Sequence, residues 1–115
     1  MANQEHLGIL KQGVKVWNDW RKGHPDPFLS PNLTSASLNN TVLAGVNFYR
    51  TNLNNARLRG ADLTGAILVN AFFVRAELRD ATLTNARLTA AQLSRADLRS
   101  AKWTGRTPAP PRPSL

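Results

Sequence analysis

From residue 31 to residue 105 a large apolar residue recurs at every fifth position. Twelve of these fifteen central positions are Leu, and the other three are Phe48, Phe73 and Trp103. The residue two places earlier is small in most units, and in eleven of the fifteen it is Ala, as in Ala61 before Leu63. No insertion interrupts the spacing, so residues 31–105 form one uninterrupted run of fifteen five-residue units.

A period of five fits neither a helix nor a straight strand. At about 100° per residue, five residues of an α-helix turn roughly 140°, so the central residues would spiral around every face. In a straight strand an odd step sends successive central residues to opposite faces. One buried face therefore requires a bend in every unit, which is typical of a repeat architecture.

The unit A-(N/D)-L-x-x, plain in Ala61-Asp62-Leu63 and Ala96-Asp97-Leu98, resembles that of the pentapeptide-repeat proteins. The resemblance implies an all-β solenoid, a right-handed quadrilateral β-helix with four units per coil. Fifteen units then make nearly four coils. It also implies that the central residues and the small residues two places earlier point inward, while the other three positions face solvent.

A twenty-residue spacing of turn residues agrees with four units per coil. Gly45, Gly65, Asn85 and Gly105 lie twenty residues apart. Gly and Asn adopt positive φ more readily than other residues. We therefore expect one corner of each coil to be a turn of type II, which needs positive φ at its third residue.

The segment before the repeats has helical spacing. Leu7, Leu10, Val14 and Trp17 fall at i, i+3, i+7 and i+10, and Gly23 with Pro25 follows as a stop signal. The W-N-x-W-R run that begins at Trp17 resembles the leader of many pentapeptide-repeat proteins. We expect residues 1–30 to be one N-terminal α-helix and a linker that cap the first coil; a docking helix for another protein is the alternative.

The C-terminal end offers two features. Residues 106–115 are rich in Pro, which predicts a disordered tail that blunts the open edge, or else a ligand for a proline-binding groove. Trp103, the last and largest central residue, either plugs the end of the stack or lies in a homodimer interface between C-terminal ends. The second alternative follows from the resemblance, because related proteins often dimerise.

The net charge of +8 is spread unevenly, with +1 before residue 31, +5 over residues 31–105 and +2 beyond. A twenty-residue coil places six arginines on or beside one side, with Glu77, Asp80 and Asp97 among them. This group is either a solvated, partly paired ladder or a patch for an acidic protein or nucleic acid. Nucleic acid is not favoured, because this side has no aromatic residue for base stacking. The six arginines are Arg57, Arg59, Arg75, Arg79, Arg95 and Arg99.

Five apolar residues occupy expected outward positions around one corner of the middle coils. Exposed apolar clusters mark interaction sites. Either the leader or the tail covers this cluster, or it binds a partner or a second copy. The five residues are Tyr49, Ile67, Val69, Phe72 and Val74.

Residues for catalysis, metal binding and cofactor binding are scarce. The chain has no Cys, and His6 and His24 both lie outside the repeats. No Ser/His/Asp set, paired catalytic carboxylates or glycine-rich phosphate loop can be assembled. We expect no enzyme activity, no metal and no cofactor. The sequence also has no apolar run of about eighteen residues and no signal-peptide pattern, so we expect a cytoplasmic protein without a membrane span.

Three functions remain. The favoured one is a protein-interaction scaffold or adaptor with an unidentified protein partner. The second is salt-sensitive binding of nucleic acid or an acidic partner through the arginines. The third follows from the resemblance, since one branch of the family modulates DNA gyrase by imitating duplex DNA. Imitation requires an acidic surface, whereas these repeats are basic.

Overall fold

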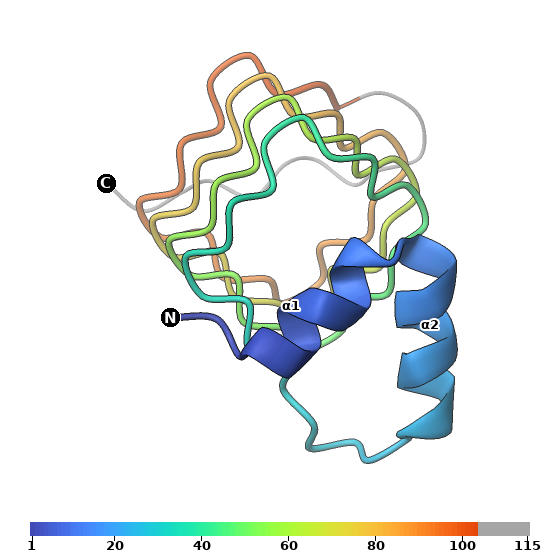
Figure 1. Cartoon of the computed structure of the whole chain (residues 1–115). Helices are drawn as coiled ribbons and strands as arrows, with labels where there is room; N and C mark the ends of the chain where they lie inside the picture. The colour runs from blue at the N-terminus through green and yellow to red at the C-terminus, as the bar shows by residue number, and fades with distance from the viewer. Residues whose placement is uncertain (104–115) are drawn as a thin grey trace.

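The computed structural model describes residues 1–103, which form two short helices followed by stacked coils (Figure 1). Helix α1 comprises Gln4–Lys11 and helix α2 comprises Val14–Gly23. From residue 31 to residue 103 there is no extended strand; the backbone forms isolated parallel bridges between residues twenty apart, such as Asn32 with Asn52. One coil therefore takes twenty residues, or four units.

Backbone hydrogen bonds join each coil to both neighbours in the stack. The Leu63 N–H donates to the Thr82 carbonyl of the following coil at 2.7 Å, and the Asp62 N–H donates to the Thr41 carbonyl of the preceding coil at 3.0 Å. We number the sides of the coil in chain order, and bridges connect only units of the same side. The first side comprises 31–35, 51–55, 71–75 and 91–95; the second 36–40, 56–60, 76–80 and 96–100; the third 41–45, 61–65, 81–85 and 101–103; the fourth 46–50, 66–70 and 86–90.

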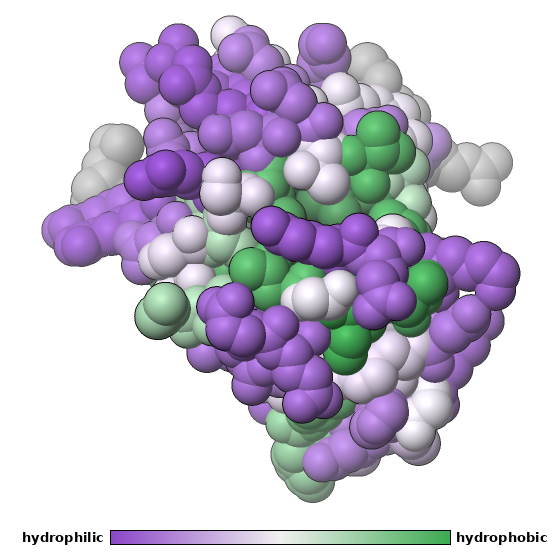
Figure 2. Space-filling view, in the orientation of Figure 1, coloured by the Kyte–Doolittle hydropathy of each residue, from purple (hydrophilic) through white to green (hydrophobic). Residues whose placement is uncertain are grey.

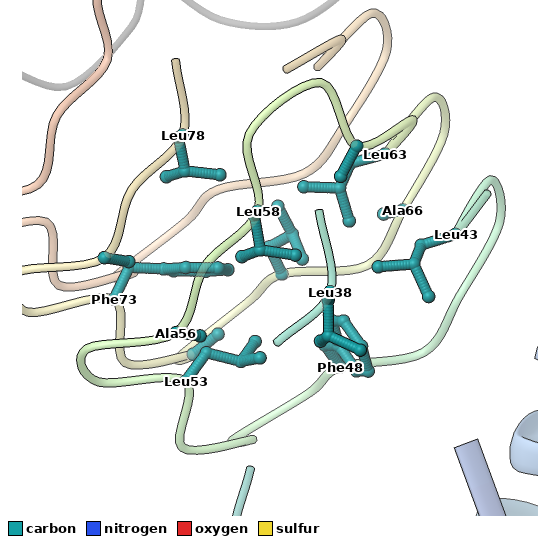
Figure 3. Packing of buried hydrophobic residues seen from close by; sticks show 14 of the residues in the cluster. Leu38, Leu43, Phe48, Leu53, Ala56, Leu58, Leu63, Ala66, Phe73 and Leu78 are labelled. Carbon is teal, nitrogen blue, oxygen red and sulfur yellow. The ribbon is translucent and has the colours of Figure 1, made fainter. Parts of the chain in front are cut away.

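The interior of the stack is filled by the central residues and the small residues before them, as the sequence predicts. Leu58, Leu63 and Ala66 have no exposed surface, and Phe73 has 1%. Figure 3 shows these side chains, from successive coils, pointing into the space that the backbone encloses. Burial of each large side chain contributes about 1.5–3 kcal/mol, so the repeating interior is the main stabilising element.

The corners differ from the expectation of one positive-φ residue per coil. Every fifth residue from residue 35 to residue 100 has positive φ, including non-glycine residues such as Arg50 (55°) and Ala90 (60°). Each corner is closed by a bond across the turn, for example from the Ala66 N–H to the Leu63 carbonyl at 3.0 Å. Gly and Asn reveal only some of these corners in the sequence, because the stacked coils hold other residues in the same conformation at a cost of about 1–2 kcal/mol each.

The prediction of one N-terminal helix was wrong, since the leader is broken into α1 and α2. Gly13 has φ 110° and ψ 165°, a conformation outside the helical region that glycine adopts without steric cost. Leu7 and Leu10 consequently belong to α1, while Val14 and Trp17 belong to α2. Within residues 1–103 no helix is long and apolar enough to cross a membrane. The predicted tail, 106–115, lies outside the described residues.

Candidate interaction surfaces

Trp17 anchors the leader to the first coil. Its side chain is fully buried, and its indole Nε1–H donates to the Asn47 carbonyl at 2.7 Å. The ring meets Phe48 edge to face with centroids 5.6 Å apart, and it contacts Trp20 at 5.1 Å. Trp17 therefore combines apolar contact with a hydrogen bond to the first edge of the stack.

Other leader groups supply the hydrogen bonds that a preceding coil would make. On the fourth side the Asn47 N–H donates to the Asn18 Oδ1 at 2.8 Å. On the first side the Asn3 N–H donates to the Asn32 carbonyl at 2.9 Å, and the Asn32 N–H donates to the His6 Nδ1 at 3.0 Å. The leader thus pairs edge groups on two of the four sides of the first coil.

Two ionisable leader side chains are partly removed from water at this junction. Burial lowers the pKa of His6; the nearby Glu5 opposes this and Arg21 adds to it. Accepting from the Asn32 N–H also requires a neutral ring with its proton on Nε2. Arg21 is 9% exposed, burial lowers its pKa, and its guanidinium lies 3.4 Å from the Thr51 hydroxyl. Sequence reasoning missed both residues, because neither lies on the predicted apolar stripe.

The five predicted apolar residues (Tyr49, Ile67, Val69, Phe72 and Val74) meet around one corner, and we call them the apolar corner. All five are partly exposed. Four of them flank the turn at Asn70, with Ile67 on the fourth side and Phe72 on the first, and Tyr49 precedes the turn at Arg50 in the coil before. The hydrogen bonds from α2 to the coils go to Gly45, Asn47 and Thr51 and to none of these five residues.

The six predicted arginines (Arg57, Arg59, Arg75, Arg79, Arg95 and Arg99) lie on or beside the second side, and we call them the arginine face. Bridges align Arg57 with Glu77 and Glu77 with Asp97. Two ion pairs form, Arg57–Glu77 at 3.7 Å and Arg99–Asp97 at 2.8 Å. The hydrogen bond from Arg99 lowers the pKa of Asp97 to about 2. Exposed pairs of this kind contribute about 0–1 kcal/mol each.

Four members of the arginine face, Arg59, Arg75, Arg79 and Arg95, make no ion pair within residues 1–103. The face is therefore partly neutralised and keeps a positive balance.

At the end of the described chain Trp103 is partly exposed and packs against the buried cluster, as does Leu98.

The structure also has a cleft between the leader and the first coil, which the expectation of a leader that caps this coil did not include. Its volume is about 320 Å³. Val42, at its edge, is 71% exposed. The sequence signal that could have indicated this cleft is Val42, an apolar residue at a position that is polar in most units. The lining residues are Leu10, Lys11, Gly13, Val14, Ser37, Leu38, Thr41, Val42 and Leu43.

Solved structures that match part of the chain are pentapeptide-repeat proteins. One, from the Arabidopsis thaliana thylakoid lumen, is 26% identical with a TM-score of 0.57; the match covers 66% of this chain and 56% of that one. A Nostoc protein is 30% identical, with a TM-score of 0.32, over 78% of this chain and 74% of that one. A third, from the cyanobacterium Cyanothece, is 33% identical, with a TM-score of 0.41, over 63% and 53%. This chain thus spans just over half the length of the Arabidopsis protein.

The comparison with family models agrees with these structures. No curated protein matches the chain. The model for pentapeptide repeats matches in eight copies, over residues 32–65 and 56–91, which is more than half of the 115 residues. Within the matched ranges, the central Leu residues and the small residues before them fill the interior of the stack. The protein therefore belongs to the pentapeptide-repeat family.

Proposed function

We propose that this protein is a non-enzymatic interaction scaffold or adaptor that binds a partner protein through the apolar corner. Its body is a right-handed quadrilateral β-helix of nearly four coils, capped by the leader, and it works in the cytoplasm. The observation that carries the proposal is a group of partly exposed apolar side chains at positions that are polar in most other units.

The physical argument starts from the filled interior. Since Leu, Phe and Ala side chains occupy the space inside the coils, the surface offers the binding sites. Phe72 and Tyr49 belong to residue types that are enriched in the buried centres of protein interfaces. Backbone bonds from both neighbouring coils hold the corner rigid: the Phe72 N–H donates to Thr51, and the Arg50 N–H donates to Val69. A preorganised surface of this kind loses little entropy on binding.

The test is affinity capture from a lysate of the source cells, with wild-type protein, Phe72→Glu and the control Thr82→Glu. Thr82 occupies the equivalent position on the third side, outside the apolar corner. At about 1 M salt, surface charge interactions are screened to about 3 Å, so apolar binding persists. We expect a protein that is retained at high salt, lost with Phe72→Glu and kept with Thr82→Glu. Equal retention by all three proteins, or no retained protein, would contradict the proposal.

A second candidate function is binding of nucleic acid or an acidic partner through the arginine face. It is supported by the four arginines that make no ion pair within the described residues. Affinity for duplex DNA should then fall steeply with salt and disappear in an Arg59/Arg79/Arg99→Glu triple variant. Gyrase modulation by DNA mimicry is less favoured, because residues 31–105 carry +5.

A further inference from the structure

The leader closes two sides of the first coil. On the other two it leaves the N–H and C=O groups at mid-side unpaired, although Asn18 donates to the Gly45 carbonyl at the end of the third side at 3.1 Å. The leader pairs backbone groups of Asn32 on the first side and Asn47 on the fourth. On the second and third sides, the N–H and C=O groups of Ser37 and Val42 make no hydrogen bond within residues 1–103. Figure 1 shows the same asymmetry, since the two helices lie against the lower and right-hand parts of the first coil.

The equivalent groups one coil further along are fully paired. The Arg57 N–H donates to the Ala36 carbonyl at 2.9 Å, and the Arg57 carbonyl accepts from the Leu38 N–H at 2.8 Å. The Asp62 N–H likewise donates to the Thr41 carbonyl at 3.0 Å, and the Asp62 carbonyl accepts from the Leu43 N–H at 2.7 Å. The backbone groups of Ser37 and Val42 are therefore unpaired only because no coil precedes them. An exposed edge of this kind is a template for an added strand.

The cleft of about 320 Å³ lies beside this edge. Leu10, Leu38 and Leu43 in its lining are buried apolar side chains, and Val14 belongs to α2. Figure 2 shows hydrophobic surface between the helices and the upper part of the first coil. An added strand directs alternate side chains to one face, so one apolar side chain can enter the cleft.

The charges around the edge are mainly positive. Lys11 lines the cleft, and Arg57, which also forms an exposed ion pair with Glu77 at 3.7 Å, lies next to Ser37 in the same column. Residues 31–50 include no acid. Asp62 lies next to Val42 in the same column, but its carboxylate already accepts hydrogen bonds from the N–H and the hydroxyl of Thr64, at 3.0 and 2.6 Å. This distribution is complementary to a negatively charged segment.

We infer that the edge of Ser37 and Val42, together with the adjoining cleft, binds an extended acidic peptide segment of a partner protein. The backbone of the segment pairs with Ser37 and Val42 on the two open sides, as the backbone of a preceding coil would. One apolar side chain of the segment inserts against Leu38 and Leu43. This surface is separate from the apolar corner. The inference shares with the proposed function only the idea that the protein binds other proteins, and each can fail without the other.

The experiment uses ¹⁵N-labelled full-length protein and three synthetic peptides of about ten residues, the length of two sides. The first alternates Glu and Thr around one central Leu. The second carries Lys in place of Glu. The third carries Pro in place of Thr, which removes the backbone donors needed for pairing. Amide chemical shifts and hydrogen exchange are followed at every resolved residue.

We expect the first peptide to slow exchange of the Ser37 and Val42 amides by about tenfold or more at saturation, and the other two peptides to have little effect. Lys11→Glu should weaken binding of the first peptide by about fivefold or more, because it places a like charge at the cleft. The control Lys22→Glu, which makes the same charge change at the far end of α2, should leave binding unchanged.

Four results would overturn the inference. One is no binding of the first peptide at millimolar concentration. Another is binding of the Pro or Lys peptide as tightly as the first. The third is a set of shifts centred on the arginine face or the apolar corner instead of the edge. Protection of Ser37 and Val42 that rises with protein concentration in the absence of peptide would show that a second copy occupies the edge, and this also refutes the peptide assignment.

Discussion

Replacement of Trp17 tests whether the leader is a separately docked cap. Trp17 is fully buried, donates a 2.7 Å hydrogen bond to the Asn47 carbonyl and packs edge to face on Phe48. The leader contacts the first coil and, through Arg21, Thr51 at the start of the second, while the coils beyond are held by their own neighbours. Loss of Trp17 should therefore release the leader and leave the repeats folded.

The magnitude follows from the contacts that each variant removes. Trp17→Ala deletes a large buried aromatic side chain, which costs about 3–5 kcal/mol of docking free energy. Trp17→Phe keeps most of the apolar contact but leaves the Asn47 carbonyl without its donor, which costs about 1–3 kcal/mol. Since about 1.4 kcal/mol is a tenfold change in an equilibrium constant, leader opening should rise by about fivefold or more in Trp17→Phe and by about a hundredfold or more in Trp17→Ala.

Native-state hydrogen exchange measures this opening. The Asn47 and Asn32 amides donate to the leader, whereas the Leu63 amide donates to Thr82 inside the stack. Exchange at Asn47 and Asn32 should accelerate by the factors above, while exchange at Leu63 stays unchanged. Val16→Ala, at a position of α2 that is 39% exposed, is the control and should change neither. Equal acceleration at Leu63 and Asn47, or no acceleration in Trp17→Ala, would refute the idea of a separately docked leader.

Three further predictions address the interior, the corners and pH. Leu63→Ala should lower the free energy of unfolding by about 2–5 kcal/mol in urea titration, because Leu63 has no exposed surface; a cost below about 1 kcal/mol would contradict a tightly packed interior. Asn70 has φ 58°, so Asn70→Val should destabilise by about 1–2 kcal/mol while Asn70→Gly should be nearly neutral; equal effects would show that φ does not matter there. The pKa of His6 lies below its ordinary 6.5, so the docked leader resists protonation more than the released leader does. Leader docking should be strongest above about pH 6.5 and weaken as pH falls toward the lowered pKa, as measured by Asn32 exchange corrected for its intrinsic rate; His6→Gln should abolish this pH dependence.

The sequence by itself determined the interior and the repeat. The central residues and the small residues before them are inward because every unit repeats the same local pattern, and burial from Leu33 to Leu83 confirms it. The twenty-residue spacing of Gly45, Gly65 and Asn85 correctly indicated corners with positive φ, although these are only three of the fourteen such corners between residues 35 and 100. The twenty-residue period also indicated which residues lie together in the apolar corner and in the arginine face, since bridges join residues twenty apart.

Only the tertiary structure decided how the leader meets the first coil. Gly13 breaks the helical stripe, and α1 and α2 then place His6, Trp17 and Asn18 against edge groups far away in the chain. The edges at Ser37 and Val42 stay open because the junction of α1 and α2 lies across a cleft from them and makes no backbone hydrogen bond to them, an arrangement that no local pattern encodes. The reason is physical. Inward packing of the central residues is favoured in every unit, so the repeated pattern shows it in the sequence. The contact between the leader and the first coil forms once, and it depends on the path of the backbone between two segments that are distant in the chain.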